Sequence, residues 1–302
     1  MMVDKNKKSS MLPYHLMTLF TVIVWGTTYV STKVLINHGL SPAEIMLLRF
    51  ILAYLCIWPL SPHRLFCNSW RDEGIMLLLG MTGGSLYFIV ENTSLSITLA
   101  SNVSLILCTA PLLSALLLRM FNKKERLYNN LIYGALLALL GVAFVVFNGH
   151  FILKLNPLGD FLAFMAALMW AFYSLLLKKV DSRYPTTLIT RKVFIYGMLT
   201  ILPYFIFRPM KLTPTMLMQP VIWMNLLFLA LLASLVCFIL WNVAVKNIGP
   251  ITATNYLYIQ PVVTLITAAV VINEVITPLA IIGCLLIIGG VYVSQKRRKN
   301  YV

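Results

Sequence analysis

The chain has 302 residues, of which 60% are hydrophobic and only 11% are charged, and its mean hydropathy is +0.87. Soluble domains use more charged residues than this, so lipid must replace water as the main solvent of the folded chain. The net charge of +15 does not indicate nucleic-acid binding, because the basic residues punctuate the apolar runs instead of gathering in one segment.

Counting apolar runs of about 18 to 25 residues predicts an all-α polytopic membrane protein with ten transmembrane helices. The five expected spans of the first half cover residues 13–36, 43–60, 75–97, 99–120 and 130–148. Those of the second half cover residues 156–178, 187–207, 221–245, 251–273 and 277–295. The connectors are short, which leaves no room for a separate soluble catalytic domain.

The basic residues predict that both termini are cytoplasmic. With the amino terminus inside, five of the 24 basic residues fall on the outer side, and the others fall inside. The five are Lys33, Arg49, Lys154, Arg208 and Lys211. This distribution follows the positive-inside rule. The first apolar run is too long for the core of a signal peptide, so we expect it to be retained.

The cysteines and histidines indicate neither a disulfide framework nor a metal site, and no cofactor is predicted. Four of the five cysteines lie within apolar runs, and Cys67 lies in a loop. The four histidines lie at or beyond the ends of the predicted spans, and no HExxH or CxxC motif occurs.

The two halves of the chain repeat each other at a spacing of about 145 to 150 residues. The corresponding pairs are Trp25 and Trp170, Lys33 and Lys178, Pro42 and Pro185, Arg49 and Arg191, Asn92 and Asn242, Pro111 and Pro261, and Glu125 and Glu274. Since each half has an odd number of spans, the second copy must enter the membrane from the opposite side. Such inverted repeats are characteristic of secondary transporters.

Three stretches give this pattern a family resemblance: WGTTYV from Trp25, ENTSLSITLASNVSLILCTAPLLSALL from Glu91, and LWNVAVKNIGPITATNYLYIQPVVTLITAAVVINE from Leu240. The chain resembles the EamA-type transporters of the drug/metabolite transporter superfamily, from about Leu12 to Gln295.

The resemblance implies two five-helix repeats, at 13–148 and 149–295, between cytoplasmic tails at 1–12 and 296–302. It also implies a secondary carrier in a bacterial inner membrane, which exports amino acids, other small metabolites or toxic organic compounds. It does not fix the cargo.

Pro111 and Pro261 lie near the middle of the predicted fourth and ninth spans. Each proline removes a helical hydrogen bond and frees a carbonyl group that lipid cannot satisfy, but protein or a water-filled cavity can. We therefore predict hinges beside a substrate path. The alternative is a pair of static kinks that improve packing.

Glu91 is the one acidic residue well inside a predicted span. It shares helical spacing with Gly84, Tyr87 and Ser94, which forms a stripe of small and polar residues that should face inward. A carboxylate at this depth indicates proton coupling or recognition of a cationic group. The alternative is a structural ion pair with Lys33 or Arg49.

Further candidates for substrate binding are polar or aromatic residues near the same spans. Asn102 and Asn255 lie near the start of the two proline-broken segments, where an amide can bind polar cargo or link helices. Trp25 and Trp170 lie well within their spans, which favours a cavity or packing role over a membrane-interface belt. The remaining candidates are Thr28, Arg49, Tyr87, Tyr173, Trp241 and Tyr258.

Small residues in the fifth and tenth spans indicate close helix contact. They are Gly134, Ala138, Gly141, Gly283, Gly289 and Gly290. They either pack each repeat internally or support a homodimer.

Two other functional classes remain as alternatives. An intramembrane enzyme would need a nucleophile with its base, paired carboxylates or metal ligands at membrane depth, and no GxSxG motif occurs. A membrane receptor or scaffold would be favoured by long extramembrane loops. We predict a transporter and no enzymatic activity. The expected partners are a small-molecule substrate, the lipid bilayer, a coupling proton and a second copy of the chain, with no nucleic acid.

Overall fold

The computed structural model of the chain describes residues 11–61, 64, 66–97, 100–121, 129–147, 156–272 and 278–295. Every regular element within these residues is a helix, which confirms the predicted all-α class. The helices of the first half are α1 (Leu12–Asn37), α2 (Pro42–Ile57), η1 (Trp58–Leu60), α3 (Trp70–Gly80), η2 (Met81–Ser85), α4 (Leu86–Ile97), α5 (Ala100–Leu107), α6 (Ala110–Phe121) and α7 (Asn129–Phe147).

The second half continues with helices of the same kinds. They are α8 (Pro157–Leu177), α9 (Thr186–Phe207), α10 (Pro214–Leu217), α11 (Pro220–Leu227), η3 (Phe228–Val236), α12 (Cys237–Ile248), α13 (Pro250–Thr254), η4 (Asn255–Ile259), α14 (Gln260–Ile272) and α15 (Pro278–Gln295).

Six helical segments in the described ranges are long and apolar enough to cross a membrane. They cover Leu12–Asn37, Pro42–Leu60, Trp70–Ile97, Pro157–Leu177, Thr186–Phe207 and Pro220–Ile248. Shorter apolar helices cover Ala110–Phe121, Ile132–Gly141 and Ile281–Val293. Large apolar side chains stay exposed along these helices, among them Leu16, Phe20 and Ile23 of α1. The chain is therefore an integral membrane protein.

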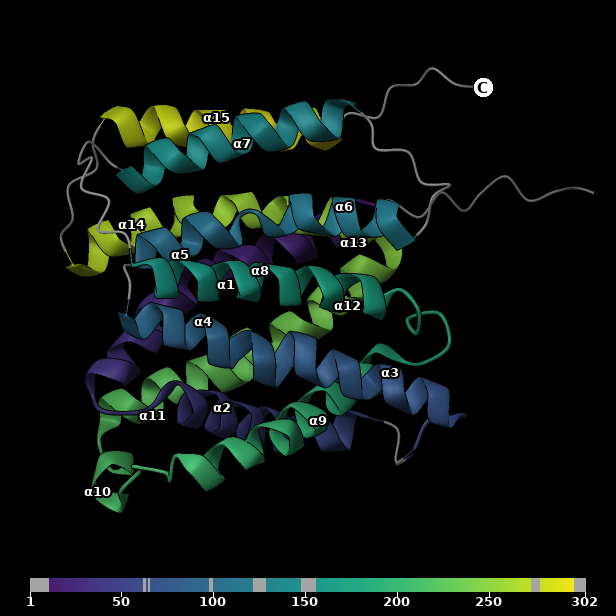
Figure 1. Cartoon of the computed structure of the whole chain (residues 1–302), viewed down its shortest axis with the longest axis vertical. Helices are drawn as coiled ribbons and strands as arrows, with labels where there is room; N and C mark the ends of the chain where they lie inside the picture. The colour runs from purple at the N-terminus through teal and green to yellow at the C-terminus, as the bar shows by residue number, and fades with distance from the viewer. Residues whose placement is uncertain are drawn as a thin grey trace, which may run out of the picture.

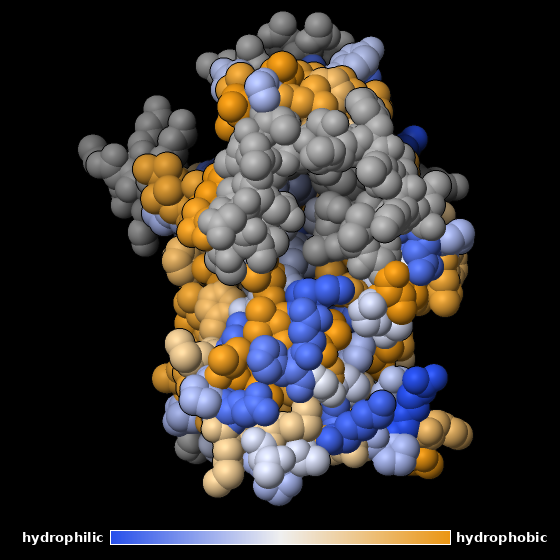
Figure 2. Space-filling view, turned by 90° about the vertical axis from the view of Figure 1, so that its left-hand side faces the viewer, coloured by the Kyte–Doolittle hydropathy of each residue, from blue (hydrophilic) through white to orange (hydrophobic). Residues whose placement is uncertain are grey.

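The long helices lie side by side (Figure 1). Helices α7 and α15 form a layer at one end of the long axis, and α2, α9 and α11 lie toward the other end, with α1, α8 and α12 between them. Figure 2 looks at one end of the helices. Hydrophilic residues gather over the lower half of this face, where hydrophobic residues also lie between them and along the sides. This arrangement suits a bundle whose helix ends meet water and whose sides meet lipid.

Capping residues determine where several helices begin. Ser41 and Glu44 form a reciprocal capping box at the start of α2, with Pro42 at the first helical position. The Ser41 N–H donates to Glu44 Oε2 at 2.7 Å, and the Glu44 N–H donates to Ser41 Oγ at 3.3 Å. Asn156 caps α8 by accepting from the Gly159 N–H at 3.1 Å. Polar groups at these span ends therefore satisfy backbone donors that a helix leaves unpaired.

Small residues bring α7 and α15 into close contact. A Cβ atom added to Gly141 would lie 2.6 Å from the Gly283 carbonyl oxygen, and one added to Gly290 would lie 2.5 Å from the Ala138 nitrogen. Only glycine at these positions allows the two backbones to approach so closely. The sequence favours either packing within each repeat or a dimer interface. The structure differs from the first alternative, because Gly141 and Gly290 join the fifth predicted span to the tenth, and a dimer interface stays a prediction.

The predicted breaks occur just before the two prolines. Helix α5 ends at Leu107, a turn follows, and Pro111 is the second residue of α6. Similarly, the 3-10 segment η4 ends at Ile259, and Pro261 is the second residue of α14. Each proline ring clashes with the carbonyl group four residues earlier and supplies no N–H, which favours a break at both positions, although α9 continues through Pro203.

Two further irregular segments were not predicted. The π-helical segment η2 joins α3 to α4 and contains Gly84 with non-helical dihedral angles (φ −130°, ψ −105°). The π-helical segment η3 joins α11 to α12. Unlike the proline breaks, η3 contains neither glycine nor proline, so its composition gives no helix-breaking signal.

Candidate functional site

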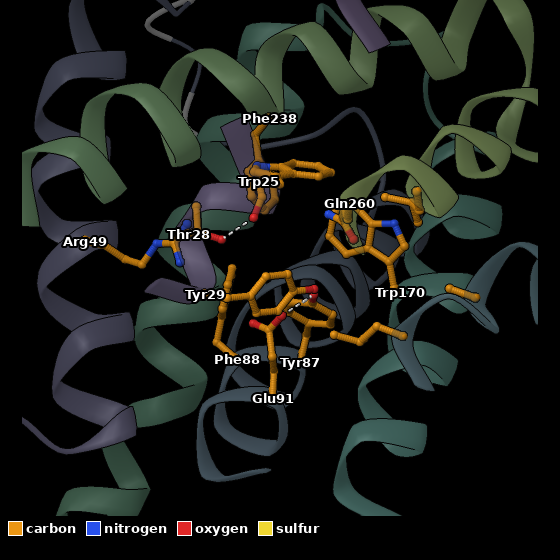
Figure 3. Close-up of a pocket in the computed structure, with 13 residues that line it drawn as sticks. Trp25, Thr28, Tyr29, Arg49, Tyr87, Phe88, Glu91, Trp170, Phe238 and Gln260 are labelled. Carbon is orange, nitrogen blue, oxygen red and sulfur yellow. Dashed lines mark hydrogen bonds between the residues drawn. The ribbon is translucent and has the colours of Figure 1, made fainter. Parts of the chain in front are cut away.

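A cavity of about 40 Å³ lies where the irregular segments meet the central helices. This volume is sufficient for ordered water molecules. Its lining comes from α1, α2, α4, α8, α12 and both proline-broken segments. The lining residues are Trp25, Thr28, Tyr29, Arg49, Tyr87, Phe88, Glu91, Leu107, Ala110, Trp170, Phe238, Leu257 and Gln260. Figure 3 shows Arg49 and Glu91 approaching the same space from different helices.

Aromatic rings build one wall of the cavity. The Trp25 ring meets the Trp170 ring edge to face, with centroids 5.0 Å apart, and Trp25 Nε1 donates to the Ala233 carbonyl at 2.9 Å. Ala233 belongs to η3, whose irregular backbone thus supplies an acceptor to the indole. Trp170 Nε1 is buried and has no hydrogen-bond partner in the described part of the chain. This wall therefore offers apolar faces and one unused donor.

Arg49 is only 3% exposed and lies on α2. Its Nε donates to Ser234 Oγ at 2.8 Å, and its guanidinium carbon lies 4.4 Å from the centroid of the Phe88 ring. The hydrogen bond and the cation–π contact fix the orientation of the guanidinium group. A buried cation is thus held at the edge of the cavity, where the charge of Glu91 acts on it, but it forms no direct ion pair among the described residues.

Glu91 is 7% exposed and lies on α4. Its Oε1 accepts from the Tyr87 hydroxyl at 2.8 Å (Figure 3). The ion pairs formed among the described residues involve Asp72 and Glu73, not Glu91. Lys33, which the sequence offers as a partner, donates instead to the Leu95 carbonyl at 2.8 Å. Lys33 therefore does not pair with Glu91, whereas a structural role for the interaction of Glu91 with Arg49 stays a prediction.

Six of the predicted binding residues line the cavity, and they are Trp25, Thr28, Arg49, Tyr87, Glu91 and Trp170. Two further candidates pack against lining residues but do not line the cavity themselves. Trp241 packs against Trp25 with ring centroids 5.1 Å apart, and Tyr173 packs against Trp170 at 5.1 Å.

Asn255 and Tyr258 are buried in η4 but do not line the cavity. Asn255 Oδ1 and the Tyr258 hydroxyl have no hydrogen-bond partner among the described residues. Asn102 lies in α5, and its side chain is outside the described residues.

The other asparagine pair of the repeat links helices. Asn92 Nδ2 donates to the Pro42 carbonyl at 3.2 Å. Asn242 accepts from the Tyr173 hydroxyl at 2.6 Å and donates to Thr190 Oγ1 at 3.0 Å. These bonds satisfy polar groups inside the bundle, which is the ordinary role of an amide in a membrane helix.

Seven lining residues were not predicted from the sequence, although three of them carry a recognisable signal. Leu107 and Leu257 stand four residues before Pro111 and Pro261, where a proline exposes the backbone. Gln260 is a polar residue directly before Pro261 in an otherwise apolar span. The others are Tyr29, Phe88, Ala110 and Phe238, which nothing in the local pattern separates from ordinary packing residues.

The two proline-broken segments touch each other beside the cavity. Cys108, in the turn before Pro111, donates its thiol to the Leu257 carbonyl at 3.7 Å. The Leu257 carbonyl is the one that Pro261 releases from the helix, four residues earlier. This carbonyl also accepts from the Gln260 backbone N–H, so its own segment and the other broken segment both satisfy it inside the membrane protein.

A family model confirms the resemblance seen in the motifs. The model of the EamA-like transporter family matches residues 12–147 and, a second time, residues 157–295. Together the two matches cover most of the chain.

Several curated proteins are similar along nearly their full length. A protein of Archaeoglobus fulgidus named "uncharacterized transporter" is 25% identical over 94% of this chain and 98% of its own. A "probable terminal-alkyne amino-acid exporter" of Streptantibioticus cattleyicolor is 28% identical over 92% of each chain. A "probable amino-acid metabolite efflux pump" of Escherichia coli is 24% identical over 92% of this chain and 93% of its own.

A solved crystal structure has the same fold. It superposes with a TM-score of 0.75 at 19% identity, covering 95% of this chain and 98% of the other.

Proposed function

The chain belongs to the EamA-like transporter family, and we propose that it is a secondary active exporter of small polar metabolites, with amino acids or related compounds as cargo. Its family and its named relatives indicate a transporter rather than an enzyme. Two relatives carry names that refer to amino-acid export or efflux. The central cavity is the site around which access alternates.

One observation carries this proposal: Arg49 and Glu91 are both buried and both line the same cavity, at the centre of an apolar bundle. Charged side chains inside a membrane protein are costly, and insertion scales assign about 2.5 to 3.5 kcal/mol to each at a helix centre. Neither forms an ion pair among the described residues. A polar cargo would offset the cost of both.

We further propose ten membrane spans in two inverted repeats of five, in a bacterial inner membrane, with both termini in the cytoplasm. The double match of the family model supports the repeat. Irregular segments also recur at corresponding places, since η2 and η3 interrupt the third and eighth predicted spans, and the proline breaks interrupt the fourth and ninth. The distribution of basic residues supports the orientation.

In this scheme Pro111 and Pro261 act as hinges. Their segments contribute Leu107, Ala110, Leu257 and Gln260 to the cavity. Bending at either break would therefore change the cavity directly, as alternating access requires.

Glu91 is the proposed coupling residue. One carboxylate can hold a proton or a cationic group of the cargo, but not both at once. Proton entry would then release cargo to the outside, which gives exchange of protons for substrate. Tyr87, which donates to the Glu91 carboxylate, would keep it oriented in both states.

The proposal is tested in vesicles that contain only the purified protein. Labelled amino acids should accumulate when a proton gradient is applied, and an excess of unlabelled substrate should drive exchange without a gradient. Trp170→Ala should reduce both, whereas Trp223→Ala, which alters a tryptophan outside the cavity, should not. Equal transport by empty vesicles, or no movement of any small metabolite tested, would refute the proposed function.

A further inference from the structure

The two buried charges of the cavity have opposite signs and act on each other through space, but they form no direct ion pair among the described residues. Arg49 and Glu91 lie on α2 and α4, and neither is in an ion pair among the described residues. A purely anionic ligand bound to Arg49 would lie beside the like charge of Glu91, and a purely cationic ligand bound to Glu91 would lie beside the like charge of Arg49. A ligand that carries both charges close together would compensate both residues.

The guanidinium group of Arg49 is prepared for a carboxylate. Its Nε donates to Ser234 Oγ at 2.8 Å, and its guanidinium carbon lies over the Phe88 ring. Within the described part of the chain, these contacts leave the two terminal nitrogens without a hydrogen-bond acceptor. Their planar N–H groups match the two oxygens of a carboxylate, a geometry that a lysine could not reproduce.

The carboxylate of Glu91 is prepared for an ammonium group. The Tyr87 hydroxyl donates to Oε1, and no donor among the described residues hydrogen-bonds to Oε2. Aromatic faces stand close by, because the Tyr87 and Trp170 ring centroids are 5.2 Å apart. A carboxylate beside electron-rich rings is a common environment for an organic cation.

The remaining lining offers an apolar surface for a side chain. Trp170 and Phe238 lie on one side, and Leu107 and Leu257 come from the two proline-broken segments. Resting on the proposed function, we propose that this cavity, once movement of the proline-broken segments widens it beyond its volume of about 40 Å³, binds an α-amino acid as a zwitterion with fixed polarity. Arg49 holds the carboxylate, Glu91 holds the ammonium group, and the apolar side chain lies against the aromatic wall.

Calorimetric binding to the purified full-length protein tests this polarity without requiring transport. The probes are L-phenylalanine, L-phenylalaninamide, which lacks the carboxylate, and 3-phenylpropionate, which lacks the ammonium group. The unaltered protein should bind L-phenylalanine at least about tenfold more tightly than either analogue, which is the scale of one hydrogen bond to a charged group. L-leucine and L-methionine serve as amino-acid probes with smaller side chains.

The variants should lose different preferences. Arg49→Gln should abolish the preference for L-phenylalanine over the amide, while keeping its preference over 3-phenylpropionate. Glu91→Gln should do the opposite. Arg49→Lys keeps the positive charge but lacks the planar guanidinium group, so it should lose part of the preference for L-phenylalanine over the amide. This variant allows the polarity to be tested even if Arg49→Gln does not fold. Arg208→Gln, at the exposed end of α9, is the matched control and should bind like the unaltered protein.

Three results would overturn the inference. The first is that none of the three amino acids binds the unaltered protein at millimolar concentration. The second is that each variant loses the preference over the amide and the preference over 3-phenylpropionate equally. The third is that Arg49→Gln loses only the preference over 3-phenylpropionate and Glu91→Gln only the preference over the amide. If no amino acid binds but the vesicles still export another metabolite, the proposed function survives and the zwitterion site fails. If the predicted binding pattern appears without any transport, the site stands and the proposed function fails.

Discussion

Two neighbouring ion pairs at the start of α3 differ in exposure, and we predict that only the buried pair contributes strongly to stability. Glu73 pairs with Lys192 of α9, and their side chains are 10% and 6% exposed. Asp72 pairs with Arg183 at 2.6 Å, but the Arg183 side chain is 46% exposed. The two pairs join the same helix to adjacent parts of the chain, so each serves as a control for the other.

Lys192→Met should lower the free energy of unfolding by about 3 to 5 kcal/mol, which is the usual cost of removing one partner of a buried ion pair. Methionine is an apolar side chain of similar length to lysine, but the change leaves the Glu73 carboxylate buried with only neutral hydrogen-bond donors. These are the Tyr196 hydroxyl and the Cys67 backbone N–H. The cost arises because a buried charge without a counter-charge is poorly solvated.

Arg183→Met should cost about 0 to 1 kcal/mol, because water screens an exposed pair. Asp72 would also keep the hydrogen bond from the Tyr184 hydroxyl at 2.7 Å. The measurement is reversible unfolding of the purified protein in mixed micelles with increasing denaturing detergent, followed by circular dichroism.

A third variant separates the buried charge from the lost contact. The double change Glu73→Gln with Lys192→Met removes both charges, and it should be more stable than Lys192→Met alone. Equal losses for Lys192→Met and Arg183→Met would refute the reasoning from burial. So would a double variant that is less stable than Lys192→Met alone.

Three further predictions concern transport and topology. Pro111→Ala or Pro261→Ala should slow transport in vesicles more than it weakens substrate binding, because a restored helix opposes bending but leaves most cavity contacts in place. Normal turnover by both correctly inserted variants would contradict the proposed hinges. Glu91→Gln should abolish accumulation driven by a pH gradient while exchange at equal pH persists at higher substrate concentration, and full accumulation would exclude a coupling role. Reporter fusions after residue 302 and near Leu153 should lie on opposite sides of the membrane, and finding both on one side would exclude the inverted repeat.

The sequence predicts the helices well because the membrane imposes a simple rule on composition. A span must satisfy its own backbone and present apolar side chains to lipid, so hydropathy alone reveals it. The same rule makes a polar residue within a span conspicuous. Glu91 is found in this way, and so is Arg49, since both interrupt apolar runs and both line the cavity.

Much of the cavity could not be predicted, because its lining depends on helix rotation and on backbone irregularity. Tyr29 and Phe238 line the cavity, whereas Trp241 stands behind Trp25, and these aromatic residues look alike in a hydropathy pattern. The segment η3 supplies partners to both Trp25 and Arg49, yet its sequence FLALLASLV reads as an ordinary apolar helix. Tertiary contacts decide its conformation, and a single sequence does not contain them.

The proposed repeat is symmetric in its scaffold but not in its charges. It relates Arg49 to Arg191, yet Arg191 lies over the Trp58 ring at 5.2 Å and does not line the cavity. It also relates the position of Glu91 to that of Trp241, which carries no charge. Both charges of the cavity therefore come from the first half of the chain. A zwitterionic cargo could not be inverted along with the proposed repeat without losing both proposed partners. We therefore expect the two halves to rock around one fixed pair of charges, so that both open states receive the cargo with the same polarity.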